Sequence, residues 1–236
     1  MSNNYFKFKK FTIEQEGCAM KVGTDGCLLG AWFDIENSKR ILDIGAGTGL
    51  ISIMAAQRCN AKITGIEIDA AAAARAVENV KNSPWNEKIE IINSDLRIFG
   101  TEELFDTIVS NPPYFANSLK CNNEQRTLAR HNDTLSPALF FAKAKELLAS
   151  NGKISLILPT ELFKEWEQEA IFKGFTPTRI TNIQTTPQKM PKRTLVEFQQ
   201  NTGKVLKEDT LILESRPGVY SKEACALLRD FYLKIE

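Results

Sequence analysis

The chain has 236 residues, of which 43% are hydrophobic and 25% are charged, and its formal net charge at pH 7 is +1. This composition is typical of a globular protein and excludes a disordered chain, and a chain of this length can bury a substantial core. The small net charge argues against a uniformly basic surface, so a polyanionic partner would have to be met by a local patch.

The chain lacks the patterns of a membrane, secreted or metal-binding protein. It has no run of about 18 consecutive apolar residues, the length that a membrane-spanning helix requires, and its first residues lack the apolar stretch of a secretory signal. Its five cysteines form no CxxC pair and it has a single histidine. These residues predict neither a disulfide framework nor a metal site. We therefore expect a cytoplasmic protein without a metal.

The expected elements begin with a hairpin at 5–15, where aromatic residues and lysines alternate, and a short helix that completes an extension over residues 1–39. Short apolar strands then alternate with helical patterns, which predicts a parallel sheet with helices on both faces. We predict helices at 49–58, 69–83, 136–150 and 161–173, and strands at 40–45, 62–68, 88–94, 105–111 and 153–159.

Two further strand-like stretches, 178–187 and 193–200, have no long helix between them, so we expect an antiparallel pair at one edge of the sheet. The sheet would then have seven strands, mostly parallel and doubly wound. Ser136 is the expected N-cap of its helix, and Gly152 is expected just after the C-terminus of that helix. We expect one domain over 40–203, with the extension 1–39 and a C-terminal extension, 204–236, that ends in a helix and packs on the same domain.

A glycine-rich turn follows the first strand of the sheet, in LDIGAGTGL at 42–50. Gly45, Gly47 and Gly49 let the backbone turn tightly and approach a ligand closely, and we expect free N–H groups there to face a crevice beyond the strand ends. Leu50 stands where a dinucleotide-binding fingerprint has its last glycine, which argues against an NAD dehydrogenase. Taken alone, the loop is also compatible with a purely structural turn.

Acidic residues follow the next two strands. Glu67 comes about 20 residues after the glycine loop, where a carboxylate can accept hydrogen bonds from both hydroxyls of a ribose. Asp69 is better explained as the cap of the following helix. Asp95 can accept from an adenine amine while the Leu96 N–H binds a ring nitrogen, although Asp95 is also a plausible helix cap.

The fourth strand ends in NPPY, Asn111 to Tyr114. Together with DIGAGTG, GIEID and NSD, in this order over about residues 40–160, the motif resembles class I S-adenosylmethionine-dependent methyltransferases that modify an amine conjugated to a planar system. The resemblance implies a Rossmann-like fold, S-adenosylmethionine as cofactor and S-adenosylhomocysteine as product. It places the cofactor against Asp43, Gly45, Gly47, Gly49, Glu67, Ile68, Asp95, Leu96 and Asn111.

In such enzymes the NPPY motif explains how a poorly nucleophilic exocyclic amine reacts. If the Asn111 side-chain oxygen and the Pro112 carbonyl accept the amine hydrogens, the lone pair is aimed at the methyl group and the developing charge is stabilised. Prolines hold these acceptors rigidly. Tyr114 would stack on the base, with Pro113 and Phe115 as further walls of the pocket. No strong general base is required.

The N-terminal block FKFKKFTIEQEGCAMKVGTDGCLLGAW, with ARH at 129–131 and PKR at 191–193, resembles bacterial enzymes that methylate the adenine amine immediately 3′ of the anticodon in a valine tRNA. The resemblance implies that Lys21, Thr24 and Asp25 close over the cofactor, although a turn and helix cap would also explain them. For the anticodon stem-loop of tRNA we expect contacts from basic residues that otherwise form solvated faces: Lys7, Lys9, Lys10, Arg126, Arg130, His131, Lys189, Lys192 and Arg193.

Other functions stay open at this point. Guanine N2 methylation of ribosomal RNA or glutamine N5 methylation of release factors would use the same clamp. The glutamine enzymes carry a helical domain before the glycine loop, whereas only about 40 residues precede it here. A catalytically silent RNA-binding module is a further alternative. Our leading hypothesis is a monomeric tRNA adenine-N6 methyltransferase with no membrane partner.

Overall fold

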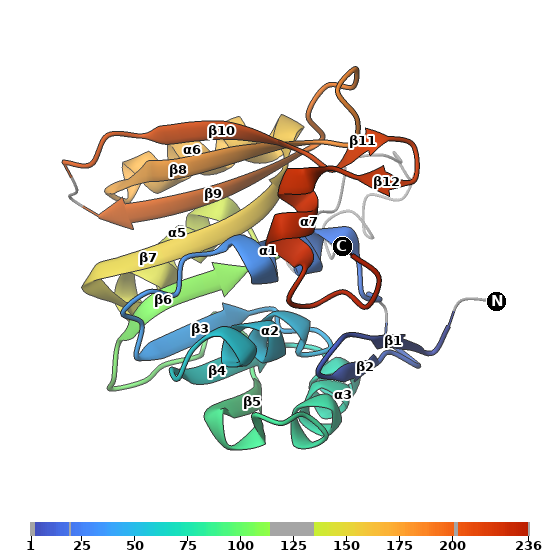
Figure 1. Ribbon diagram of the computed structural model, residues 1–236. Helices are drawn as coiled ribbons and strands as arrows, with labels where there is room; N and C mark the ends of the chain where they lie inside the picture. Colours follow the sequence, from blue (N-terminus) through green and yellow to red (C-terminus); the bar gives the residue numbers. More distant parts are fainter. Residues whose placement is uncertain (1–2, 19, 114–134, 201–202, 236) are drawn as a thin grey trace, which may run out of the picture.

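The computed structural model describes residues 3–18, 20–113, 135–200 and 203–235 (Figure 1). Its centre is an eight-stranded sheet with the strand order β10-β8-β9-β7-β6-β3-β4-β5. The pairs β3–β4, β4–β5, β3–β6 and β6–β7 are parallel, as predicted. The bounds are β3 Arg40–Ile44, β4 Lys62–Glu67, β5 Ile89–Asn93, β6 Phe105–Ser110, β7 Leu148–Pro159, β8 Phe175–Gln184, β9 Arg193–Gln200 and β10 Lys207–Ile212.

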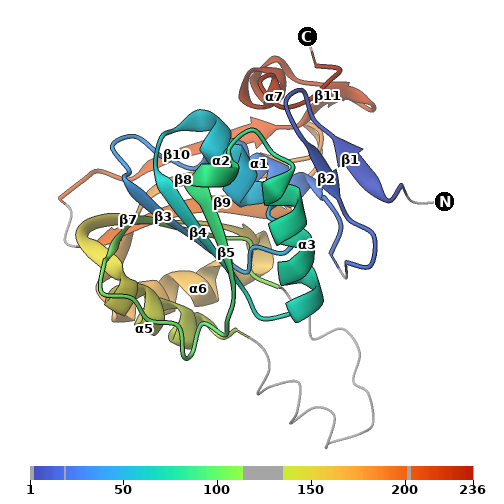
Figure 2. The same ribbon diagram turned by 90° about the horizontal axis from the view of Figure 1, so that it is seen from below.

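Helices cover both faces of this sheet, which confirms the doubly wound α/β architecture (Figure 2). Helices α1 (Thr24–Trp32) and α2 (Leu50–Arg58) pack in one buried cluster, and α5 (Pro137–Leu147) and α6 (Thr160–Phe172) pack in the other. Because β3 is covered on both sides, its residues 41–44 are all buried, and three of these four are apolar. Helix α3 (Ala70–Lys81) and the 3₁₀ turn η1 (Asn86–Lys88) connect β4 to β5.

The antiparallel pair is confirmed as β8 and β9, but the predicted count of seven strands was too low by one in the described chain. The additional strand, β10, pairs parallel to β8 and takes the edge position beyond it. Its first four residues, Lys207 to Thr210, are exposed. Charged side chains are common on edge strands because they discourage pairing with another chain, and they hide the strand from a hydrophobic pattern.

The expectation for Ser136 was correct, whereas that for Gly152 was wrong. The Ser136 hydroxyl accepts a hydrogen bond from the Leu139 N–H and caps α5. Helix α5 ends at Leu147, and the chain passes directly into β7, which contains Gly152. A Cβ atom on Gly152 would lie 2.5 Å from the Leu148 side chain. Close packing within the irregular start of β7 therefore explains this glycine.

The two ends of the chain pack together. The predicted hairpin is β1 (Tyr5–Lys7) with β2 (Thr12–Glu14), and its Phe6 and Phe8 rings lie about 6 Å from the Tyr232 ring. The Lys9 N–H donates to the Phe231 carbonyl at 2.8 Å. The C-terminal helix, α7 (Lys222–Leu228), is shorter than the sequence suggested and follows a small hairpin, β11 (Glu214–Arg216) with β12 (Val219–Tyr220). The domain boundaries stay a prediction.

Candidate active site

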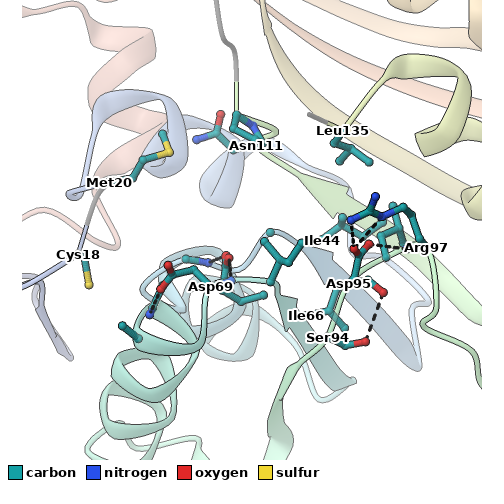
Figure 3. Close-up of a pocket in the computed structure, with 18 of the residues that line it drawn as sticks. Cys18, Met20, Ile44, Ile66, Asp69, Ser94, Asp95, Arg97, Asn111 and Leu135 are labelled. Atoms are coloured by element: carbon teal, nitrogen blue, oxygen red, sulfur yellow. Dashed lines mark hydrogen bonds and ion pairs between the residues drawn. The ribbon is translucent and has the colours of Figure 1, made fainter. Parts of the chain in front are cut away.

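A cavity of about 800 Å³ lies where the carboxyl ends of four parallel strands meet (Figure 3). Its walls come from the residues that follow β3, β4, β5 and β6, from the segment 17–25 and from the start of β9. The chain runs outward from β3 through β4 to β5 and then returns to place β6 on the other side of β3. Ligands of open α/β sheets bind at such a reversal of strand order, and this volume is typical of a small-molecule site.

The glycine loop shapes one wall of this cavity. Gly45 and Gly47 line it with φ angles of +74° and +55°, values that other residues rarely adopt. Gly49 has a φ of +80° as well and precedes α2, and because a Cβ there would lie 3.4 Å from the Ala76 Cβ, an ordinary contact, its conformation and not its packing requires glycine. Our expectation of free loop N–H groups was wrong at four positions. Gly45 and Ala46 donate to the Ile66 carbonyl, Gly47 donates to Glu67, and Gly49 donates to the Ala46 carbonyl.

Glu67 is held by the backbone at the end of β4. One carboxylate oxygen accepts from the Gly47 N–H and the other from the Asp69 N–H, both at 2.9 Å. The side chain lines the cavity, and each carboxylate oxygen keeps capacity for a further hydrogen bond. Asp69 caps α3 by accepting from the Ala72 N–H, as expected. The geometry of Glu67 therefore suits a diol, and this role stays a prediction.

The residues after β5 line the side of the cavity at the right of Figure 3. Asp95 and Leu96 both line it, as does the exposed side chain of Ile68 from the β4 end. Arg97 was not predicted from the sequence, and its guanidinium lies 2.5 Å from one Asp95 oxygen. The other oxygen accepts from the Arg97 N–H, and this partner lowers the pKa of Asp95. Asp95 thus stays ionised and can still accept hydrogen bonds.

Asp43 lies in the core of β3 below the loop and is not among the residues that line the cavity. Its side chain is fully buried, one carboxylate oxygen accepts from the Ser52 hydroxyl at 2.7 Å, and the other has no hydrogen-bond partner. Burial raises the pKa of Asp43 to about 7, which the Ser52 hydrogen bond only partly opposes. The unpaired oxygen fits a cationic ligand nearby, although direct contact stays a prediction.

Asn111 and Pro113 line the cavity at the end of β6, and Pro112 between them is buried. Figure 3 shows the Asn111 side chain on the wall opposite Asp69 and Asp95. Directly before it, the buried Ser110 donates to the Ile44 carbonyl at 2.7 Å and joins the ends of β6 and β3. This hydrogen bond holds the neighbouring Asn111 side chain beside the glycine loop. The rest of the clamp, Tyr114 and Phe115, lies outside the described residues.

The segment before α1 lines one side of the cavity with Cys18 and Met20 (Figure 3). Gln15 supports it, because its side-chain oxygen accepts from the Val22 N–H at 2.8 Å. Asn79 of α3 was also overlooked. Its amide donates to the Thr48 carbonyl of the glycine loop and to the Glu14 carbonyl of β2, so it joins the loop to the hairpin.

Asp25 and Arg193 meet at the cavity, with the Arg193 Nε 2.7 Å from an Asp25 oxygen. Asp25 was predicted to contact the cofactor and Arg193 to contact RNA, so the structure joins residues of both predicted groups. Lys21 and Thr24 are exposed and are not among the lining residues. Their role as cofactor contacts stays a prediction.

The remaining predicted RNA contacts are spread over two regions. Lys7, Lys9 and Lys10 are exposed on the N-terminal hairpin, where the Lys9 ammonium donates to the Arg229 carbonyl at 2.5 Å. Lys189 and Lys192 are exposed in the connection between β8 and β9. Arg126, Arg130 and His131 lie outside the described residues.

Among the described residues, no group of three or more His, Cys, Asp or Glu side chains is arranged to hold a metal ion. None of the helices in the described ranges is both long enough and apolar enough to cross a membrane.

Comparison with known proteins identifies the family. Residues 18–182 match the model of the family described as "Methyltransferase small domain". Proteins named tRNA1(Val) (adenine(37)-N6)-methyltransferase are 47% identical in Phocaeicola vulgatus and 45% identical in Bacteroides fragilis, in each case over 100% of both chains. The chain belongs to this methyltransferase family. The protein of that name from Haemophilus influenzae is 43% identical over 97% of this chain and 98% of its own.

Solved structures support the fold of this methyltransferase. A predicted O-methyltransferase from Agrobacterium tumefaciens has a TM-score of 0.71 at 22% identity, covering 88% of this chain and 96% of its own. The M. jannaschii TYW2 protein in complex with AdoMet has a TM-score of 0.57 at 16% identity, over 83% of this chain and 85% of its own. The predictions of an enzyme, of methyl transfer and of S-adenosylmethionine as cofactor are confirmed.

Proposed function

We propose that this methyltransferase transfers the methyl group of S-adenosylmethionine to the N6 amine of adenine 37 in tRNA1(Val). The relatives that carry this activity in their names match the chain over its whole length. The observation that carries the proposal is the position of Asn111, which lines the same cavity as Gly45, Gly47 and Glu67. A planar amine held by Asn111 would therefore meet a ligand held by the glycine loop.

The cavity fits the cofactor by the chemistry of its lining. Glu67 offers a backbone-fixed carboxylate for the ribose hydroxyls, and Asp95 with Leu96 offers an acceptor and an apolar surface for the adenine. The unpaired oxygen of Asp43 lies in the core behind the loop, where negative charge favours a cation. When bound, S-adenosylmethionine would supply an activated methyl group on a sulfonium.

The chain's own residues then act on the target amine. The Asn111 side-chain oxygen and the Pro112 carbonyl accept its two hydrogens, hold the lone pair toward the methyl group, and stabilise the positive charge that develops on nitrogen. The Ser110 hydrogen bond to Ile44 and the ring of Pro112 keep these acceptors in place, so little ordering is needed at each turnover. The methylated nitrogen then releases its proton to water without a dedicated base.

Nucleoside mapping tests the substrate. The purified chain is incubated with isotope-labelled S-adenosylmethionine and, in separate reactions, with bulk tRNA from a strain that lacks this modification, with ribosomal RNA or with a release factor. Ribonuclease or protease fragments are then analysed by mass spectrometry. We expect labelled N6-methyladenosine at position 37 of tRNA1(Val). Label in N2-methylguanosine of ribosomal RNA or in a release-factor glutamine would replace this substrate assignment, and no transfer to any of them would favour the silent RNA-binding module.

We also propose that the protein works in the cytoplasm as a monomer. The proposal draws on the tRNA substrate in the names of its relatives and on its cysteines, four of which lie in the described chain as free thiols. Sedimentation velocity at micromolar concentration should give the mass of one chain, 26.5 kDa. A dimer mass would overturn the monomer.

A further inference from the structure

The connection between β8 and β9, residues 185–192, lies at the same edge of the sheet as the cavity. Both β7 and β8 pair antiparallel with β9, so β8 ends at the edge where β6 and β7 end. Arg193, the first residue of β9, lines the cavity. Figure 1 shows the connection as an orange loop that projects beyond the ends of β8 and β9. The loop therefore stands beside the entrance to the active site.

Backbone hydrogen bonds fix this loop at its base and within its turn. The Lys192 N–H donates to the Ile183 carbonyl at 3.1 Å, and the Lys189 N–H donates to the Thr186 carbonyl at 3.0 Å. The Lys192 carbonyl accepts from the Thr160 N–H at the start of α6. A loop tied at these points presents its side chains in a defined position, which reduces the entropy lost when they bind a partner.

Met190 lies in the outer part of this loop, followed by Pro191, and its side chain is 82% exposed. A single exposed apolar residue is ordinary on a protein surface. Here, however, its neighbours Lys189 and Lys192 are exposed cations, and Arg193 reaches the cavity. An apolar side chain among cations at the entrance matches a ligand that is anionic along its backbone and apolar on its flat faces, which describes single-stranded RNA.

We propose that Met190 packs against a base that neighbours the target adenine and thereby helps to hold the anticodon loop open. This inference rests on the proposed function. Removing one base from the stack exposes the face of its neighbour, and inserted apolar side chains, including methionine, stabilise such unstacked steps. The unbranched thioether of methionine also makes favourable contacts with aromatic rings. Lys189 and Lys192 then contact phosphates, which position the loop without reading its sequence.

Phe172 provides a matched control. It is 80% exposed, ends α6 beside Lys173, and lies near the start of β8, at the opposite edge of the sheet from the cavity. Phe172→Ala removes as much exposed apolar surface as Met190→Ala, next to a lysine, but away from the entrance. Met190→Leu keeps most of the apolar contact surface and is the conservative variant.

The experiment measures the Kd of a fluorescent anticodon stem-loop by anisotropy and its methylation by label transfer. We expect Met190→Ala to raise the Kd and the KM for RNA about three- to tenfold, with kcat and cofactor affinity nearly unchanged, as the loss of one or two partly buried apolar groups implies. Met190→Leu and Phe172→Ala should stay within about twofold of the parent protein. An effect of Met190→Ala no larger than that of Phe172→Ala would overturn the proposal.

Stem-loops with an abasic site on either side of the target adenine identify the contacted base. For one of them, the difference in Kd between the parent protein and Met190→Ala should disappear, because the base that Met190 touches is already absent. An undiminished difference with both abasic RNAs would also overturn the proposal. If the parent protein transfers no methyl group to the stem-loop, the proposed function fails, and the binding measurements still decide whether Met190 contacts a base.

Discussion

The two halves of the cavity are built differently. On the side formed by the ends of β3, β4 and β5, the polar groups already have partners within the protein: Glu67 accepts two backbone N–H groups, and Arg97 pairs with Asp95. On the side formed by β6 and β9, Asn111 directly follows β6, and Arg193 begins β9 just after the exposed residues 187–190 and pairs with Asp25. We expect the first half to act as a preformed receptor for the cofactor and the second half to meet the RNA.

This difference suggests which property each half controls. A side chain that is already oriented loses little entropy on binding, so the β3–β5 half should set the affinity for the cofactor. The β6–β9 half should set RNA affinity and the rate of transfer, because its groups meet the target base. Variants on one side are therefore expected to leave the properties of the other side nearly unchanged.

The largest expected effect is that of Asn111→Ala. Removing the side-chain acceptor should lower kcat by about 10²- to 10³-fold, the usual result of deleting one group that stabilises developing charge. Cofactor affinity, measured by calorimetry, should change less than about threefold if the halves are independent, and the thermal midpoint reports folding. Joint loss of cofactor binding and transfer would show that Asn111 instead supports the structure of the cavity.

Glu67→Ala should have the next largest effect, on the opposite property. Loss of hydrogen bonds from a charged acceptor corresponds to about a 10- to 100-fold weaker cofactor affinity, with RNA affinity unchanged. Asp69→Ala is the matched control, because this carboxylate also lines the cavity but caps α3. It should cost about 1 kcal/mol of stability and little cofactor affinity. Equal losses of affinity in both variants would contradict the special role of Glu67.

Asp43, in the first half, makes the free energy of unfolding depend on pH. Its pKa is raised to about 7 in the folded protein, against about 3.9 when unfolded, so the folded state binds the proton more tightly. Its contribution to the free energy of unfolding is therefore fully present below about pH 4 and is lost as the pH rises through 7. The loss amounts to a few kcal/mol at most, because a difference of one between the two pKa values corresponds to about 1.4 kcal/mol.

The Asp43→Asn variant isolates this contribution. The amide in this variant does not titrate, so the variant should lose stability less steeply between about pH 4 and pH 8 than the parent protein does. Urea unfolding of both proteins without cofactor, at a series of pH values across this range, measures the difference in slope. Parallel curves for the two proteins would mean that burial does not raise the pKa of Asp43.

The sequence predicted the features that depend on neighbouring residues. The strand ends, the glycine turn and the caps at Asp69 and Ser136 follow from local patterns, and the structure has them where expected. It did not predict partners that are distant in sequence. The pair of Asp25 with Arg193 spans 168 residues, and neither segment contains a pattern that predicts its contact with the other.

Two further errors of the sequence predictions have the same physical origin. The loop N–H groups were expected to be free, yet β4 lies close enough for its Ile66 carbonyl to accept two of them. Strand β10 has an exposed, charged sequence because only its partner β8 makes it a strand. In each case the structure depends on a contact with a residue distant in sequence, and a local sequence pattern does not predict such a contact.

The ion pair of Asp25 with Arg193 tests whether the two halves are truly separate, and its expected effect is the smallest. Asp25→Ala and Arg193→Ala should each raise the KM for the stem-loop about two- to fivefold, and a double-mutant cycle should give a coupling of about 0.5–1 kcal/mol, as expected for a pair that is about one-third exposed. High salt should reduce this coupling.

A second ion pair, between Lys153 and Asp34, serves as the control for this cycle, because Lys153 is the strand neighbour of Thr107 near the start of β6, away from the cavity. Lys153→Ala should leave the KM for RNA unchanged. If Asp25→Ala alters cofactor affinity only and shows no coupling to Arg193→Ala, the halves act independently. If the coupling appears in the KM for RNA, the segment that covers the cofactor also positions Arg193, and cofactor binding then prepares the RNA side of the cavity.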